Sequence, residues 1–401
     1  MRLPLLESEF YCFMENLMYT SLIGSLPRSE KVLRSRRMWQ AGMISHSEYL
    51  DAVNAQTAEV VRFQEELGLD YIVSGEIARD NYVSFIAEKL GGVREMSQAD
   101  MLEYIDDKAE FEKQLSILDV PAQSIKNAIC VDKLSYKNGI AVDELRLLKS
   151  LTKRKVKITL PGPYLVTRSM WLYELSKNGY ASKEALGEDV IKIFTREIAE
   201  LQKIGVDEIQ LDEPVLTEIV FTEGRPRSFM CASLSQRKDP TEELIFATHL
   251  IRSVMEKIDR SKSIAAMHVC RGNWSKNESI LLTGPYTPLL ELFSKINADK
   301  LSLEFSTPRA GELKALLADE RIRNKVILGL GVLNPRFDRI ETVEEITARA
   351  KEALTFIDKK NLCFNPDCGF ATFSNRPVNT YDNIRRKVQN MIQARDIVQN
   401  L

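Results

Sequence analysis

The stretch IAAMHVC, residues 264–270, is a short apolar run that ends in a histidine and a cysteine. An uninterrupted apolar run of this length is typical of a strand buried on both faces of a parallel sheet. Seven other runs have the same character: TSLIGS (20–25), DYIVSGE (70–76), VKITLPGP (156–163), DEIQLDEP (207–214), KLSLEFS (300–306), KVILGLG (325–331) and NLCFNPDCG (361–369). Between them lie longer segments, such as 182–205 and 341–357, whose apolar residues repeat at the spacing of one helix face. This alternation predicts an α/β fold with a parallel sheet.

Eight strand–helix units predict a closed (β/α)8 barrel of the TIM type, formed by a single domain that spans residues 1–401. A further apolar run, AICVD (128–132), falls between the second and third strands, and we expect it in an excursion from the barrel. Glutamates interrupt the apolar segment at residues 1–20, so we expect a short N-terminal arm there and not a signal peptide. A doubly wound open sheet is the alternative fold.

Polar side chains of unusual character cluster at the C-terminal ends of the predicted strands. They are Ser25, Glu76, Asp212, His268, Cys270, Glu304 and Cys368. In a (β/α)8 barrel this end carries the active site, whereas a doubly wound sheet gathers its ligands at a single switch point. The distribution therefore favours the barrel and places the candidate site at one end of it.

The composition excludes several classes of function. The 401 residues are 44% hydrophobic, and 55 Lys and Arg nearly balance 57 Asp and Glu, so we expect no nucleic-acid partner. No stretch approaches the roughly 18 uncharged apolar residues that a membrane span needs. Six cysteines in a chain of this length are too few for a disulfide framework. We expect a cytoplasmic protein with reduced thiols and no membrane contact.

Four of the strand-end residues offer a metal site. His268 and Cys270 are two positions apart on one strand, so their side chains point to the same face. Glu304 ends the next strand, and Cys368 follows the last one. One imidazole, two thiolates and a carboxylate form a ligand set that favours Zn²⁺. Each residue alone is a weak signal, because a buried cysteine is commonly just a small hydrophobe. Their shared position at one barrel end carries the zinc prediction.

From about residue 19 onward the sequence resembles the catalytic C-terminal barrel of the cobalamin-independent methionine synthases. The resemblance rests on IGS (23–25), GLDYIVSGEIARDN (68–81), PGP (161–163), IQLDEP (209–214), MHVC (267–270), LEFSTPR (303–309), GLGVLNPR (329–336) and NPDCGF (365–370). The zinc ligands of the family fall on His268, Cys270, Glu304 and Cys368, so all four ligand types are retained. The resemblance implies a zinc enzyme that activates the thiol of homocysteine and methylates it to methionine.

The resemblance also implies a pocket for the amino acid. Glu76 and Asp212 end what we take to be neighbouring strands, and two carboxylates beside one cleft suit a ligand ammonium. These positions resemble the carboxylates that hold the homocysteine amino group, and the turn Ile23, Gly24, Ser25 resembles the backbone site for its carboxylate. Paired acid–base catalysis, as in glycosidases, and simple ion pairs with Arg79 or Arg28 are the alternatives.

The half of the site that would bind the methyl donor departs from the family. The tryptophan on which the pterin packs aligns with Ser169, two residues before Trp171, and the histidine that would protonate the pterin aligns with Leu333. A methyl-pterin needs a general acid to leave, so we expect slow transfer from the usual folate polyglutamate. We leave the donor open between a methyl-folate and a corrinoid-bound methyl, carried by a partner protein or a free cofactor.

Six arginines in or beside the motifs would either bind an anionic donor or pair with nearby carboxylates: Arg28, Arg79, Arg168, Arg271, Arg309 and Arg336. Three other functions fit part of the pattern. Alkyl transfer to another thiol, as in the epoxyalkane:coenzyme M transferases, would not need the two carboxylates. A zinc hydrolase is disfavoured because two cysteine ligands lower the Lewis acidity of the metal. A structural zinc site in a binding protein is disfavoured, because such sites usually draw their ligands from short CxxC loops and these ligands are spread over three strands.

Overall fold

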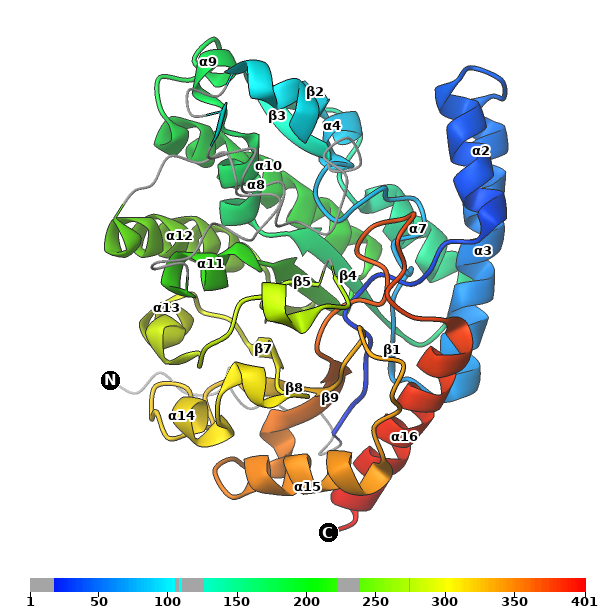
Figure 1. Cartoon of the computed structure of the whole chain (residues 1–401), viewed down its shortest axis with the longest axis vertical. Helices are drawn as coiled ribbons and strands as arrows, with labels where there is room; N and C mark the ends of the chain where they lie inside the picture. Colours follow the sequence, from blue (N-terminus) through cyan, green and yellow to red (C-terminus); the bar gives the residue numbers. More distant parts are fainter. Residues whose placement is uncertain (1–17, 105–107, 110–125, 222–238, 274) are drawn as a thin grey trace.

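The computed structural model describes residues 18–104, 108–109, 126–221, 239–273 and 275–401. Within them seven parallel strands form one curled sheet, with helices around its outside (Figure 1). In spatial order the strands are β1 (Tyr71–Ile72), β4 (Lys155–Pro161), β5 (Glu208–Asp212), β6 (Ile264–Val269), β7 (Lys300–Glu304), β8 (Ile327–Leu333) and β9 (Leu362–Pro366). Within the six strands β4 to β9, every residue except Lys155 is buried, as expected for a parallel sheet that is covered on both faces. The predicted α/β fold is therefore present, with the curled sheet of a TIM-like barrel.

Residues 20 and 21 link the two edge strands of this sheet. Thr20 forms a parallel bridge with Phe364 of β9, and Ser21 forms one with Tyr71 of β1. The sequence predicted a strand over residues 20–25, but the structure has only these two isolated bridges there. The reason is that the backbone beyond Ser21 hydrogen-bonds to the loops that follow β1 and β9. Residues 1–17 of the predicted N-terminal arm (1–20), which include Cys12, lie outside the described residues, and so does Cys231.

A second, two-stranded sheet lies in the chain between β1 and β4. Its strands β2 (Leu90–Ser97) and β3 (Lys126–Tyr136) pair antiparallel, with a register shift between Gly91 and Val93. The run 128–132, which the sequence placed outside the barrel, belongs to β3. Three short helices flank this hairpin: α4 (Ile86–Lys89), α5 (Gln98–Met101) and α9 (Tyr173–Ser176).

Helices surround the curled sheet (Figure 1). They are α2 (Glu30–Gln40), α3 (His46–Leu67), α7 (Val142–Leu151), α8 (Pro163–Met170), α10 (Lys183–Ile204), α11 (Val215–Phe221), α12 (Pro240–Met255), α13 (Leu290–Lys295), α14 (Leu313–Leu317), α15 (Val343–Leu354) and α16 (Tyr381–Gln399). Local signals set their ends. Ser45 and Glu48 form a capping box at the start of α3, and Gly68 ends it with a φ of 86°. Within the described ranges, no helix is long and apolar enough to cross a membrane.

The register of the parallel strands aligns their C-terminal ends. Asp212 of β5 is the register partner of His268 of β6, and Glu304 of β7 is the partner of Gly331 of β8. Parallel strands that stop at the same level bring the side chains that follow them to one end of the sheet. The candidate site residues named from the sequence come from this end.

Candidate active site

The structure brings three of the four predicted metal ligands together. His268 lies in β6, Cys270 directly follows that strand, and Cys368 lies two residues beyond β9. Their candidate ligand atoms all lie within 4.8 Å of one another, and all three residues are buried. The sulfur atoms of Cys270 and Cys368 are 3.9 Å apart. We call these residues the His–Cys–Cys group.

The protonation of this group suits a metal. The hydrogen bond from Cys368 lowers the pKa of the Cys270 thiol to about 5, and the same contact raises the pKa of Cys368. Burial lowers the pKa of His268, but Asp212 and Cys270 outweigh it and raise the pKa to about 10. The two ring nitrogens each face an acceptor at 3.1 Å, Asp212 Oδ1 and the carbonyl oxygen of Asp367. These shifts favour a positive imidazole beside a thiolate, and a metal ion bound by the group would take the place of the protons.

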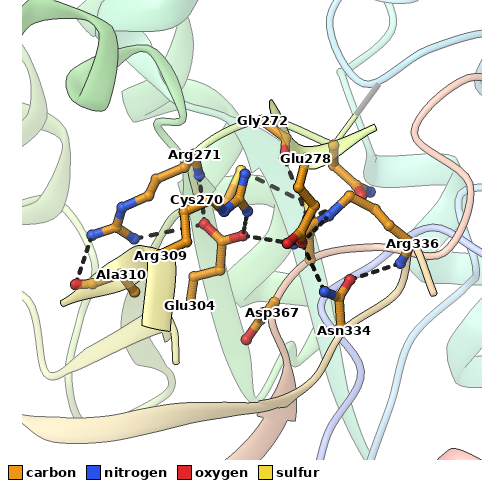
Figure 2. Close-up of polar contacts among 12 residues, drawn as sticks. Cys270, Arg271, Gly272, Glu278, Glu304, Arg309, Ala310, Asn334, Arg336 and Asp367 are labelled. Atoms are coloured by element: carbon orange, nitrogen blue, oxygen red, sulfur yellow. Dashed lines mark hydrogen bonds and ion pairs between the residues drawn. The ribbon is translucent and has the colours of Figure 1, made fainter. Parts of the chain in front are cut away.

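Glu304, the fourth predicted ligand, is not part of the His–Cys–Cys group. It lies beside Cys270 in a cluster of arginines (Figure 2). The backbone N–H of Arg271 donates to Oε2 at 2.8 Å, Arg336 donates to Oε1 at 3.1 Å, and Arg309 also binds Oε1. Burial raises the pKa of Glu304, but the three arginines outweigh it and lower the pKa. Both carboxylate oxygens are thus engaged by the protein, and coordination by Glu304 stays a prediction.

A pocket opens onto the His–Cys–Cys group, with about 560 Å³ of empty space when its mouth toward solvent is included. It is lined by Ile23, Ser25, Glu76, Tyr82, Asp212, Pro214, His268, Cys270, Asn273, Cys368, Gly369, Thr372 and Phe373. The candidate metal ligands and the candidate amino-acid contacts therefore share one cavity, although they come from segments far apart in the sequence. Of the predicted site residues, Gly24 and Glu304 do not line it.

Glu76 reaches the cavity from an unusual backbone position. Its φ is 56°, in the left-handed region that non-glycine residues rarely adopt. Its Oε1 accepts a hydrogen bond from Thr159 Oγ1 at 2.7 Å and lies 3.5 Å from the Arg79 guanidinium. Burial raises the pKa of this carboxyl group. A Cβ atom at Gly24 would lie 2.2 Å from Oε1, so a side chain at position 24 would displace the Glu76 carboxylate from its present place.

Asp212 faces Glu76 from a strand that is not its neighbour. The prediction that the two end neighbouring strands is wrong, because β4 lies between β1 and β5. The curl of the sheet still brings both side chains to one cavity. Asp212 Oδ1 accepts a hydrogen bond from Gln210 Nε2 at 2.7 Å. Ser25 and Gly369 form another part of the cavity wall, and a Cβ atom added at Gly369 would lie 2.2 Å from Ser25 Oγ.

The six arginines near the motifs all have protein partners. Arg79 binds Glu144 and Glu76, Arg168 binds Glu218, Arg271, Arg309 and Arg336 bind Glu304, and Arg28 donates to four backbone carbonyls. The structure thus favours the second of the two interpretations of these residues, pairing within the protein. Charged pairs of this kind organise the loops at the end of the sheet and leave the cavity to Glu76 and Asp212.

Sequence reasoning missed six lining residues: Tyr82, Pro214, Asn273, Gly369, Thr372 and Phe373. Most stand inside or next to the motifs, so the signal for them was proximity to a strand end. Ser169, Trp171 and Leu333, which bore on the methyl donor, are not among the lining residues. Leu333 is fully buried at the end of β8, and Ser169 is buried in α8. The cavity therefore does not identify the donor.

A cavity at the C-terminal ends of parallel strands, with potential metal ligands at its base, is typical of an α/β barrel enzyme with a metal centre. Residues 18–396 match the family described as the catalytic domain of cobalamin-independent synthases, and the chain belongs to this family. This confirms the resemblance inferred from the motifs.

Individual relatives agree with the family match. The chain is 27% identical over 381 residues to a methionine synthase of Pyrococcus horikoshii and covers 92% of its length. It is 26% identical over 356 residues to a 5-methyltetrahydropteroyltriglutamate–homocysteine methyltransferase of Halalkalibacterium halodurans, but covers only 40% of that longer protein. A B12-independent methionine synthase from Shewanella sp. W3-18-1, solved with selenomethionine, shares the fold with a TM-score of 0.70 at 21% identity, over 96% of this chain and 98% of that one.

Proposed function

We propose that this chain is a zinc-dependent methyltransferase that methylates the thiol of homocysteine to form methionine. The observation that carries the proposal is the shared cavity, which places the His–Cys–Cys group beside Glu76 and Asp212. Methionine synthase is also the name of a relative that the chain covers nearly in full. We further propose that residues 1–401 form one (β/α)8 barrel domain, in which the two bridges at residues 20 and 21 stand in the place of the first strand.

The donor set fits zinc. Two sulfur atoms and an imidazole within 4.8 Å supply three of the four ligands of a tetrahedral zinc site. Asp212 at 3.1 Å from the ring of His268 is the carboxylate partner that metal-bound histidines commonly have. His268, Cys270 and Cys368 would hold the ion, with Glu304 as a fourth ligand that exchanges for the substrate. When bound, zinc makes a coordinated thiol a thiolate at neutral pH.

The residues of the chain would then bind and orient the amino acid. Glu76 and Asp212 provide two carboxylates for its ammonium group, and the turn at residues 23–25 provides the side on which its carboxylate lies. Held at both ends, the substrate directs its sulfur toward the His–Cys–Cys group. Methyl transfer forms the S–CH3 bond of methionine and breaks the bond between the methyl and its donor, which keeps the bonding electron pair. The thiol proton leaves to solvent, and an amine donor takes up a proton.

For the donor, a folate-derived methyl group is the better supported proposal. The family is described as cobalamin-independent, so a corrinoid partner is not supported. The longer relatives carry 5-methyltetrahydropteroyltriglutamate in their name. The chain nevertheless lacks the acid expected near Leu333, so we keep the expectation that transfer from methyl-folate is slow.

The test is metal analysis combined with methionine formation. The zinc-loaded full chain is incubated with homocysteine and 5-methyltetrahydrofolate, and methionine is quantified by mass spectrometry. We expect about one zinc per chain and methionine that depends on all three components. Coenzyme M in place of homocysteine and an ester substrate without a thiol test the alkyltransferase and hydrolase alternatives. Methylation of coenzyme M but not of homocysteine, or turnover of the ester alone, would overturn the proposal.

A further inference from the structure

Gln210 connects two walls of the cavity without lining it. It is fully buried in β5, two residues before Asp212, so both side chains point to the inside of the curled sheet. Its Nε2 donates to Asp212 Oδ1 at 2.7 Å and to the carbonyl oxygen of Ile23 at 3.3 Å. Asp212 and Ile23 both line the cavity. One buried amide therefore holds the proposed ammonium site and the proposed carboxylate side together.

The orientation of this amide follows from its third partner. Gln210 Oε1 accepts a hydrogen bond from the Nζ of Lys157 at 3.0 Å, and a lysine ammonium can only donate. Lys157 is itself fixed, because it also binds the carbonyl oxygen of Leu22 and lies 3.9 Å from Glu208. If the amide were flipped, its NH2 group would face the Lys157 ammonium and its oxygen would face the Asp212 carboxylate, and neither pair can form a hydrogen bond. The NH2 group of Gln210 must therefore face the cavity walls.

The bond from Gln210 determines which oxygen of Asp212 is available to a ligand. Oδ1 accepts the hydrogen bond from Gln210 Nε2 on one side and lies 3.1 Å from His268 Nδ1 on the other. Oδ2 has no hydrogen-bond partner among the residues that the structure describes, and Asp212 is 8% exposed. A carboxylate with one oxygen held and the other free presents a single, fixed acceptor to the cavity.

We propose that Gln210 is a positioning residue for the substrate amino acid, because it aims Asp212 Oδ2 at the ammonium and fixes the Ile23 turn beside the carboxylate. The inference rests on the proposed function. The inference assigns Gln210 a role in homocysteine affinity although its buried side chain does not line the cavity. It also predicts that this role is separate from metal binding, since the hydrogen bonds of the Gln210 side chain go to Lys157, Ile23 and Asp212 and not to a member of the His–Cys–Cys group.

The test compares two buried glutamines. Gln210→Met keeps the length of the side chain and removes its hydrogen bonds. Gln202→Met does the same at a buried glutamine of α10 whose partners, Asp259 and Ser263, are not in the cavity. Homocysteine binding to the zinc-loaded full chain is measured by calorimetry, together with zinc content, thermal unfolding, KM and kcat. Gln210→Glu, which keeps the bond to Lys157 but repels Asp212, replaces Gln210→Met if the latter does not fold.

We expect Gln210→Met to raise the Kd and KM for homocysteine about tenfold or more, while kcat at saturating homocysteine and the zinc content stay near wild type. Gln202→Met should bind homocysteine normally. A folded Gln210 variant with wild-type Kd, or equal losses in the two variants, would overturn the inference alone. A wild-type chain that binds zinc but no homocysteine would overturn the proposed function, and this inference with it.

Discussion

Asp212 Oδ1 lies 3.1 Å from His268 Nδ1, so a residue that we assign to the substrate also touches a candidate metal ligand. The contact joins the two halves of the site through one carboxylate. The amino-acid pocket and the metal site therefore share Asp212, and variants must be chosen that change one of them and keep the other intact.

Loss of a member of the His–Cys–Cys group should remove the metal. Cys368→Ser and His268→Ala each leave only two of the three ligands, and we expect both to lose zinc and methyltransferase activity together. Cys130→Ala is the control, since Cys130 is also buried but lies in β3, outside the His–Cys–Cys group. The measurement is zinc per chain by atomic emission after dialysis. Full zinc occupancy in both ligand variants would contradict the assignment.

Asp212→Asn should separate substrate binding from metal binding. Gln210 donates to Oδ1, so the asparagine oxygen must face Gln210 and His268, and its NH2 group must face the cavity. A donor cannot accept the substrate ammonium, and losing a charged hydrogen bond costs about 1.5–3 kcal/mol. We expect a homocysteine Kd roughly 10–100-fold higher, with zinc retained. Calorimetry on the zinc-loaded variant checks this, and normal homocysteine affinity would show that the pocket is misplaced.

Gly24→Ala should act chiefly by displacing Glu76. The added Cβ atom would lie 2.2 Å from Glu76 Oε1 and 3.1 Å from its Cδ, so the carboxylate must move. We expect weaker homocysteine binding with unchanged zinc content, because Glu76 is not a member of the His–Cys–Cys group. Glu76→Gln gives the reference loss for this position. If Gly24→Ala bound homocysteine as tightly as wild type, the close approach of residue 24 to Glu76 would have no functional role.

Glu213 should make the stability depend on pH. Burial raises the pKa of this carboxyl group from 4.5 to about 8, although it accepts hydrogen bonds from the backbone N–H groups of Tyr164 and Leu165. Between these two values the folded state holds a proton that the unfolded state has released. The free energy of unfolding should therefore fall as the pH rises from 4.5 to about 8 and level off above it.

Urea denaturation across this range measures the effect of Glu213. Glu213→Gln should flatten the fall, because glutamine does not titrate. The exposed Glu320→Gln should leave it unchanged. A Glu213→Gln variant with the same pH slope as the wild type would exclude Glu213 as its source.

Leu333 and Ser169 stand where the family has a histidine and a tryptophan, and an assay that compares several methyl donors tests the effect of this difference. We expect methionine from methyl-folate without a corrinoid protein, at a rate that is low and does not depend on the number of glutamates in the folate tail. The reason is that a general acid contributes typically 10²–10⁴-fold and none is placed at Leu333. Turnover with the triglutamate at or above about 1 s⁻¹, the lower end of ordinary enzyme rates, would contradict this expectation. Methionine formed only from methylcobalamin would restore the corrinoid alternative.

Much of the fold could be predicted because its signals are local. Apolar runs of strand length mark β4 to β9 within a few residues of their observed ends, and the amphipathic pattern at 182–205 matches α10 (Lys183–Ile204). Residues 20–25 and 70–76 were less predictable. They yield only two bridges and the short β1, because tertiary hydrogen bonds to loops replace strand pairing there.

The sequence by itself determined the chemistry at the strand ends. A parallel sheet must bring its C-terminal ends to one side, so the strand-end positions and the family resemblance predicted one cluster of His268, Cys270, Glu304 and Cys368, of which the structure groups all but Glu304. Only the tertiary structure decided which contacts each of these side chains makes. It places Glu304 among three arginines, sets β4 between Glu76 and Asp212, and buries Gln210 where one amide serves two cavity walls. Strand order, curl and hydrogen-bond competition depend on contacts between distant segments, and no local pattern in the chain records them.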